Sequence, residues 1–295
     1  MKNKTNLTPY LYILPGFIFI MVWIIFPMIK AFQISLYDWN IFSSAKSIFI
    51  GVDNYIKAFK DDLFWMAFKN SLLYALVTVI GQLLLGLLVA LLIDKIIHGR
   101  IFFRTLYYLP VVTSWVVCSL LFKYLFNSSP AGLINYVLVQ VLHLFPEPVT
   151  WLNEPGTAFV ALYTLGIWKG VGWTMVIFLA AIQAIPEELH QAALVDGANE
   201  WQVAKKIIIP LLVPTIILTS IMLMIGAFQT YIPIALITRG DPIHRTDVIL
   251  SFMYDKAFSD REFGYGSALS FILIIIVFAI SQIQMRLGKS DSQLY

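Results

Sequence analysis

A lysine inside an apolar stretch is the sharpest candidate for chemistry in this sequence. Lys169 lies in the segment WKGVGWT, within a run long enough to cross a bilayer. A charged side chain at that depth costs roughly 2.5–3.5 kcal/mol on insertion scales, so we expect it to face protein or a wet cavity. It could line a solute pathway, or its ammonium could be satisfied by backbone carbonyls at a helix contact. The second interpretation is favoured, and Gly170 and Gly172 would permit the close approach that either one needs.

A second group of candidates combines hydrogen-bonding side chains with aromatic faces. Amide and hydroxyl groups can pair with the hydroxyls of a sugar, and an indole face can cover the C–H surface of its ring. The candidates are Trp168, Trp173, Gln229, Thr230 and Tyr231. For each one alone, bonding between helices or anchoring at the membrane interface is the favoured interpretation. Together with Lys169 they form the predicted substrate pathway.

The sequence lacks the patterns typical of an enzyme or a metal site. Its four histidines form no HExxH motif or other close ligand pair. Gly288, Lys289 and Ser290 match the end of a phosphate-binding loop, but Ile283 stands where that loop needs glycine, and no strand precedes it. We therefore predict no catalytic residue, no metal and no cofactor. If ATP drives this protein, a separate subunit must hydrolyse it.

Composition indicates a membrane protein. Of the 295 residues, 59% are hydrophobic and 13% are charged, which is too apolar for an ordinary soluble protein. The net charge is only +3, and no basic stripe interleaved with aromatics predicts a nucleic-acid partner. Cys118 is the single cysteine, so no intrachain disulfide can form.

Six segments are long and apolar enough to span a bilayer, at about 10–29, 72–93, 105–126, 158–184, 207–237 and 268–284. The first has no evident cleavage site, so we expect it to remain as a transmembrane helix. Prolines interrupt the third and fifth segments. Such prolines are tolerated where neighbouring helices satisfy the freed carbonyls, which predicts a packed bundle.

The remaining segments are expected at the surface. Residues 51–68 predict a short surface helix before the second span, and residues 132–145 are too short to cross the membrane. We predict an all-α integral membrane protein with three parts. These are a first helix and external segment at 1–68, a transmembrane domain at 69–285 and a tail at 286–295.

Basic residues near the span ends predict the orientation. With the N-terminus inside, the inner segments, which include Lys2, Lys4, Lys205 and Lys206, are richer in Lys and Arg than the outer ones. Both termini and the loop at about 186–206 are therefore predicted to be cytoplasmic.

A polar stretch at 186–214 predicts two short helices around a sharp turn. Pro186 suits a first helical position, and Glu187 and Glu188 suit the positive end of the helix dipole. The residues that then share one helix face are Leu189, Ala192 and Ala193. This small face permits docking against a partner protein, and an interfacial helix without a partner is the alternative.

The turn and the second helix carry their own signals. Gly197 follows Asp196 where a left-handed C-terminal cap needs glycine. Asn199 can cap the second helix, and Trp201 is expected on its apolar face. Pro210 predicts a bend.

These residues closely resemble the cytoplasmic loop of the membrane subunits of ABC importers. In that family a signature of Glu-Ala-Ala, Asp-Gly-Ala and a later apolar-Pro pair forms the coupling helix that docks on the ATPase. The matching residues are Gln191, Ala192, Ala193, Asp196, Gly197, Ala198, Ile209 and Pro210. Gln191 departs from the pattern, because the family usually has Glu there.

Motifs elsewhere resemble the carbohydrate-type importer permeases, so the resemblance covers nearly the whole chain. They are SLYDWN at 35–40, GVDNY at 51–55, GRIFFRTLYYLP at 99–110, LFNSSPAGLIN at 125–135, LITRGDP at 236–242 and GYGSALS at 264–270. The family form near 238 more often reads Thr-x-Gly-Gly-Pro, from which Arg239 and Asp241 depart.

The resemblance implies a type I ABC importer permease fold and import of a sugar or related polyol, with glycerol phosphate or an oligosaccharide fitting equally well. It also implies a second permease subunit, two ATPase subunits and an extracellular solute-binding protein. In such pairs, substrate contacts can lie mainly in one subunit. The main alternative is a secondary transporter or channel for a small polar solute. A secondary transporter would be favoured by acidic residues inside the spans, and these spans hold almost none. A membrane enzyme is a more distant alternative, because the sequence contains no catalytic cluster.

Overall fold

A computed structural model describes residues 8–40, 47–95 and 98–291, with side chains described between residues 11 and 286. Lys2 and Lys4 of the orientation prediction, and the end of the tail at 292–295, lie outside the described residues. Contacts divide the chain into two units, each described by itself below. The first is Met1–Asp61 with Met253–Ile274, and the second is Asp62–Phe252 with Ile275–Tyr295.

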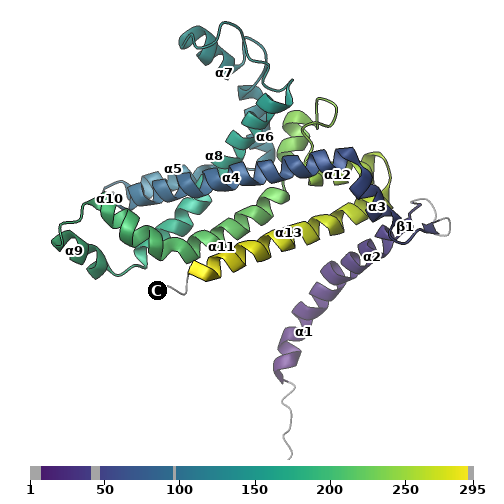
Figure 1. The fold of residues 1–295 in the computed structure, drawn as a ribbon, viewed down its shortest axis with the longest axis horizontal. Helices are drawn as coiled ribbons and strands as arrows, with labels where there is room; N and C mark the ends of the chain where they lie inside the picture. The colour runs from purple at the N-terminus through teal and green to yellow at the C-terminus, as the bar shows by residue number, and fades with distance from the viewer. Residues whose placement is uncertain (1–7, 41–46, 96–97, 292–295) are drawn as a thin grey trace, which may run out of the picture. The chain divides into compact units, whose positions relative to one another are not determined.

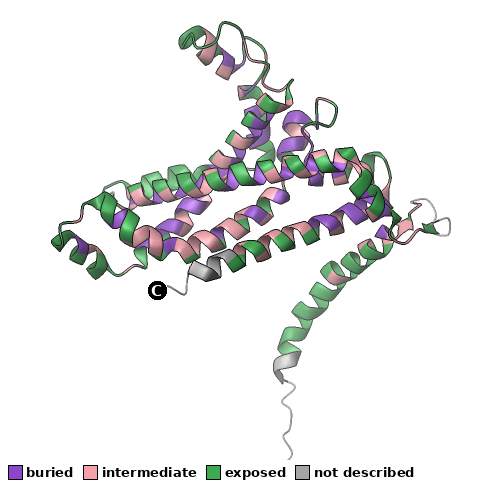
Figure 2. Cartoon of the chain, viewed as in Figure 1, coloured by how far each residue is buried: buried purple, intermediate pink, exposed green. Residues whose placement is uncertain are grey.

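The first unit begins with a long apolar helix. Helix α1 (Thr8–Ile20), the π-helical turn η1 (Met21–Ile25) and α2 (Phe26–Ser35) follow one another without a break. From Leu11 to Ser35 the side chains are almost all exposed, as Figure 2 shows, which fits a helix surrounded by lipid. A two-stranded antiparallel pair, β1 (Tyr37–Asp38) and β2 (Ile48–Phe49), and helix α3 (Asp53–Lys60) come next.

A buried asparagine ties these pieces of the first unit together. The side chain of Asn54 on α3 donates to the carbonyls of Ser35, at 2.9 Å, and Tyr37, at 3.0 Å. One carbonyl belongs to the last residue of α2 and the other lies just beyond it, where the helix no longer supplies partners. The amide therefore fixes the exit of the chain from the first helix.

The second unit is built on two long helices, α4 (Asp62–Asp94) and α8 (Pro155–Gln183), which pack against each other (Figure 1). Glycines on α8 allow its neighbours α4 and α5 (Arg100–Val112) to approach closely. A Cβ at Gly170 would meet the Gln82 side chain of α4, and one at Gly172 would meet the backbone carbonyl of Tyr107. Helix α11 (Ile209–Phe228) packs on both long helices, and α5 packs on α8.

The predicted third span at 105–126 is not one helix. Helix α5 ends at Val112, α6 runs over Trp115–Leu125, and the two are bent by 94°. Thr113 is extended, with φ −72° and ψ 141°, and the Ser114 side chain caps α6 by accepting from the N–H of Val116. The prediction missed this break because the apolar composition is continuous across it.

Two other predicted boundaries are corrected. The predicted fifth span at 207–237 ends its α-helix at Phe228, and a separate π-helical turn, η5 (Ile234–Thr238), follows Pro233. The predicted surface helix at 51–68 is only α3, because α4 already begins at Asp62. Asp61 is extended between these two helices and separates them.

The other elements are short, except for the last helix. They are α7 (Leu133–Asn135), η3 (Tyr136–Val141), α9 (Glu187–Val195), α10 (Glu200–Val203), η4 (Ala204–Ile208), α12 (Ile249–Tyr254), η6 (Asp255–Ser259) and α13 (Phe263–Asp291). Among the described residues, five helices are long and apolar enough to span a membrane, or six if the bent pair α5–α6 is one span.

Candidate functional site

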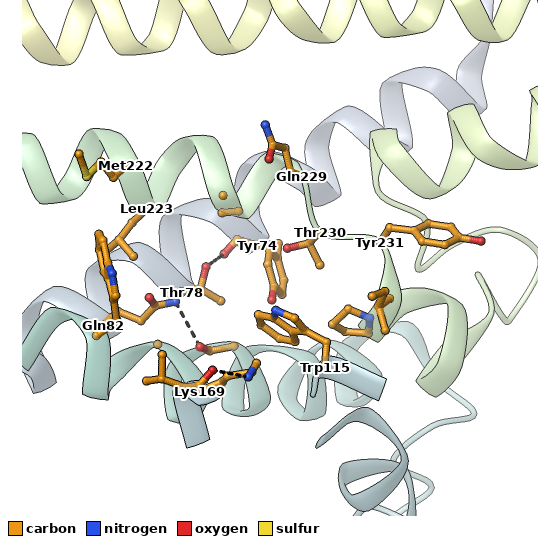
Figure 3. Close-up of a pocket in the computed structure, with 18 residues that line it drawn as sticks. Tyr74, Thr78, Gln82, Trp115, Lys169, Met222, Leu223, Gln229, Thr230 and Tyr231 are labelled. Carbon is orange, nitrogen blue, oxygen red and sulfur yellow. Dashed lines mark hydrogen bonds between the residues drawn. The ribbon is translucent and has the colours of Figure 1, made fainter. Parts of the chain in front are cut away.

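A cavity of about 660 Å³ lies in the second unit among α4, α8, the α5–α6 break and the end of α11. Figure 3 shows Lys169 and Trp115 on one side, with Met222 and Gln229 on the opposite side. Five of the six predicted pathway residues line it. They are Lys169, Trp173, Gln229, Thr230 and Tyr231.

The wall from α4 was not predicted. Tyr74, Thr78 and Gln82 line the cavity and follow one another at intervals of four residues, so they share one helix face. The Gln82 amide donates to the carbonyl of Gly166 on α8, at 3.2 Å. Three polar residues at helical spacing inside an apolar span are the signal that could have found this wall.

The residues after α11 reach the cavity because the helix ends there. Gln229 is the C-cap of α11, and its N–H and that of Thr230 bond to Gly226 and Ala227 in a closing turn, each at 3.2 Å. The chain then leaves the helix axis, which brings Thr230 and Tyr231 to the cavity wall. Two amides, four hydroxyls and two indoles line the cavity, contributed by Gln82, Gln229, Tyr74, Thr78, Thr230, Tyr231, Trp115 and Trp173.

Lys169 is buried, with 5% of its surface exposed. Its ammonium donates to the carbonyls of Pro110, Val111 and Thr113, at 2.8, 3.2 and 2.6 Å. It also lies over the ring of Trp115, 4.8 Å from the centroid. This geometry matches the favoured interpretation, a lysine satisfied by carbonyls at a helix contact.

Trp168 is the one predicted pathway residue that does not line the cavity. Its ring packs on Phe122 of α6, with centroids 5.5 Å apart, and 40% of the residue is exposed. One helix step turns a side chain by about 100°, so neighbours such as Trp168 and Lys169 face different surroundings. The prediction chose Trp168 for its indole face and did not consider which side of the helix carries it.

The loop at 186–206 contains the predicted turn. Gly197 has φ +82°, the left-handed conformation expected of it, and Asp196 is the C-cap of α9. The N–H of Ala198 bonds to Ala193 at 2.9 Å, and that of Gly197 bonds to Leu194 at 3.0 Å. These two bonds are the Schellman motif, so the glycine prediction is confirmed.

The second helix of the loop is also capped as predicted. Asn199 Oδ1 accepts from the N–H of Gln202 at 2.9 Å, and Gln202 Oε1 accepts from the N–H of Asn199 at 2.8 Å, forming a reciprocal capping box. One detail was wrong, because Pro186 is the N-cap rather than the first helical residue. The helix from Glu200 to Phe228 continues through Pro210, and the bend predicted there stays a prediction. Pro210 lies in the first turn of α11 after a π-helical turn, where its missing N–H is tolerated.

The exposed face of the loop differs from the predicted alanine face. Ala193 is only 9% exposed, whereas Ala192 is exposed. Trp201, predicted on the apolar face of the second helix, is 69% exposed. The large apolar side chains on the surface of the loop are Leu189, Leu194, Val195 and Trp201.

Ion pairs connect the loop to the end of α4. The carboxylate of Glu200 lies 3.1 Å from the ammonium of Lys95 and 3.6 Å from Nε2 of His190. The hydrogen bond from Lys95 is the main cause that lowers the pKa of Glu200 from its ordinary value. Asp94, beside Lys95, pairs with Arg100 at 2.6 Å.

Comparison with known proteins gives this geometry a context. The chain is 34% identical over 295 residues to the probable ABC transporter permease protein YurN of Bacillus subtilis, covering 99% of this chain and 100% of the relative. It is 31% identical to the trehalose/maltose transport system permease protein MalF of Thermococcus litoralis, covering 98% and 96%. A crystal structure of a bacterial ABC transporter involved in the import of the acidic polysaccharide alginate superposes with a TM-score of 0.84, at 24% identity, over 96% of this chain and 95% of that one.

The structural match confirms the predicted all-α, type I ABC importer permease fold. Residues 82–289, which include the loop and all of the cavity wall except Tyr74 and Thr78, match the family described as the binding-protein-dependent transport system inner membrane component. This chain therefore belongs to that family and is a multi-pass, inner-membrane permease subunit of an ABC transport system.

Proposed function

We propose that this permease imports a sugar or a related polyol across the cytoplasmic membrane, driven by a partner ATPase. The observation that carries the proposal is the wall of the 660 Å³ cavity, with its amide, hydroxyl and indole groups. Uncharged hydrogen-bonding groups next to aromatic faces suit a polyhydroxylated solute. The relative named for trehalose and maltose transport supports the same class of substrate.

The proposed pathway residues have separate roles. Trp173 offers an aromatic face to a sugar ring, and Gln229, Thr230 and Tyr231 offer hydrogen bonds from the part of the wall that follows α11. Tyr74 and Gln82 extend the polar wall along α4. Trp168 is left out of the pathway, because it packs on Phe122 outside the cavity.

The loop at 186–206 is the proposed contact with the ATPase. Glu187, Glu188 and Gln191 expose polar side chains on α9, while Leu194, Val195 and Trp201 expose apolar ones. A short helix with an apolar face is suited to insertion into a groove of a partner. The turn at Asp196, Gly197 and Ala198, and the continuous helix through Pro210, join this contact to α11.

The complete transporter comprises this chain, a second permease subunit, two ATPase subunits and an extracellular solute-binding protein. ATP binding closes the ATPases and moves α9 with them. The helical bundle then switches from an inward-facing to an outward-facing state, and hydrolysis resets it. The family's description as binding-protein-dependent supports the role of the solute-binding protein.

In this assembly both termini and the 186–206 loop are cytoplasmic. A cysteine placed at the exposed Asn199, in a Cys118→Ala background, should resist an impermeant thiol reagent applied to intact cells. It should react after the cells are permeabilised. Ready labelling from outside would reverse the orientation and remove the ATPase contact.

Two tryptophans on the same helix provide a matched test of the cavity. The cognate binding protein is first screened against sugars and polyols, and uptake of the identified ligand is then measured. Trp173→Ala should raise the KM of uptake by about three- to tenfold, because a ring contact worth roughly 0.5–1.5 kcal/mol is lost. Trp168→Ala should leave the KM unchanged, since this ring lies outside the cavity.

Two results would count against the proposal. A binding protein that takes only ligands without hydroxyl groups would overturn the sugar assignment. Equal effects of the two tryptophan variants on the KM would remove the cavity from the pathway while leaving the transport class intact.

A further inference from the structure

The break between α5 and α6 leaves backbone carbonyls without helical partners. The last carbonyls of α5 cannot bond to N–H groups four residues ahead, because the chain turns through 94°. In the apolar interior of a membrane each unpaired carbonyl is costly, so a stable break needs replacement donors. The break forms part of the cavity wall through Val111 and Trp115.

Five carbonyls around the break are paired, through three sources. Leu109 accepts from the hydroxyl of Thr113, at 2.9 Å, and Ser114 accepts from the N–H of Cys118, at 3.1 Å. In the stretch between Leu109 and Ser114, the carbonyls of Pro110, Val111 and Thr113 all accept from the ammonium of Lys169. One side chain from α8 therefore replaces several backbone donors.

The ammonium has no donor left for a solute. A lysine side chain has three N–H donors, and three carbonyl bonds involve this one. Its positive charge also suits the negative end of α5, and the face of Trp115 covers it at 4.8 Å. Lys169 thus faces the cavity with its polar end turned toward the α5–α6 backbone.

We propose that Lys169 is a positioning residue that holds the bend between α5 and α6 and thereby shapes this wall of the cavity. It acts on transport through the backbone of residues 110–113 rather than by binding the solute. The inference rests on the hydrogen bonds of the break and holds whichever solute is carried.

Spin labels at Ile101 and Tyr124, both exposed, report the bend in the full-length chain purified with its co-assembled subunits, in a Cys118→Ala background. With a rise of 1.5 Å per residue, straightening the bend would lengthen the distance between the labels by about 10 Å. Lys169→Met should broaden the distance distribution toward longer values. Lys169→Arg, which keeps a charged donor group, should restore a narrow distribution.

Two controls make the result specific. Lys123→Met removes another lysine that bonds to a carbonyl, that of Leu236 at 3.0 Å, and should leave the Ile101–Tyr124 distance unchanged. A reference pair at Leu84 on α4 and Val160 on α8 should not move in any variant. If Lys169→Met is not recovered, Lys169→Gln replaces it, with a smaller shift in the same direction expected because two N–H donors remain.

A narrow, unchanged Ile101–Tyr124 distance in the assembled Met or Gln variant would overturn the proposal. Equal broadening of both label pairs would also overturn it, because the lysine would then stabilise the whole bundle rather than the bend. Broadening confined to the Ile101–Tyr124 pair, with recovery in Lys169→Arg, would support it.

Discussion

The loop at 186–206 and the α5–α6 break both end a helix abruptly, but they satisfy the freed backbone groups differently. In the loop, Gly197 closes α9 by its own turn, and Asn199 caps the next helix with a partner three residues away. At the break, the donor is Lys169, which is 56 to 59 residues from the carbonyls it binds. Water can reach the loop, whereas the break lies beside a cavity within the packed helices.

This difference explains how far the sequence predicts each region. Local caps are encoded by adjacent residues, so the turn at Gly197 and the cap at Asn199 were predicted correctly. A cap supplied from a distant helix depends on tertiary packing, so its effect on α5 and α6 could not be read from their own residues. The two regions should therefore respond differently to the same kind of substitution.

The largest expected effect is on the fold of the cavity region. A Cβ at Gly172 would overlap the backbone carbonyl of Tyr107, which cannot move as a flexible side chain would. Gly172→Ala should therefore push α8 from α5 and cost about 1–3 kcal/mol of stability, as overpacking does. Thermal unfolding of the purified complex measures this.

Gly156→Ala, on the same helix, is the matched control, because a Cβ there meets nothing within 4 Å. Its unfolding temperature should equal or slightly exceed that of the parent, since alanine favours helix. Equal unfolding temperatures for Gly172→Ala and the parent would show that α8 and α5 are not in obligatory close contact.

A smaller effect on folding, with a large one on coupling, is expected at Gly197. No atom lies within 4 Å of a Cβ there, so the constraint is the backbone, at φ +82°. A β-branched residue in this conformation is strained by about 1–2 kcal/mol or more. Gly197→Val should reach the membrane at normal levels but reduce stimulation of the ATPase by about tenfold.

Gly197→Asn tests whether the effect on ATPase stimulation comes from backbone strain or from the loss of glycine as such. Asparagine tolerates the left-handed region, so most of the stimulation should remain. If Gly197→Val transports solute at the normal rate, the turn is not the coupling element. Gln191→Glu is a companion variant that restores the residue usual in the family. It should maintain or improve coupling if the partner ATPase has the basic group with which that carboxylate would pair.

Part of the fold and the α4 part of the cavity wall escaped prediction for related reasons. The span at 105–126 was predicted as one helix because hydropathy depends on composition and is insensitive to backbone conformation. The extended Thr113 therefore left no signal in it. Trp168 was assigned to the pathway for its indole face, yet its ring packs on Phe122. Tyr74, Thr78 and Gln82 form one polar face, but their role depends on α8 and α11 packing over them. Helix periodicity could have shown the face, although not what covers it.

The smallest expected effect is the pH response of the loop, where charges are exposed. Glu200 faces Lys95 at 3.1 Å and His190 at 3.6 Å, and His190 also lies 4.0 Å from Glu187. Because its pKa in the folded loop is lowered, mainly by the hydrogen bond from Lys95, Glu200 stabilises the loop at pH values above the usual range of a glutamate. That contribution is lost as the pH falls through the lowered pKa, when the carboxylate is protonated.

The mobility of a spin label at the exposed Val195 should therefore rise on acidification below that range. The rise should be small and should shrink at high salt, because the Glu200 side chain is 52% exposed and water screens the pair. Glu200→Gln should give raised mobility at neutral pH and remove this acid step, whereas Glu188→Gln, an exposed change on the same loop, should keep it. If the label in Glu200→Gln still becomes more mobile on acidification, the pH response belongs to another group. The local caps, rather than the Glu200–Lys95 ion pair, would then hold α9 and α10 together.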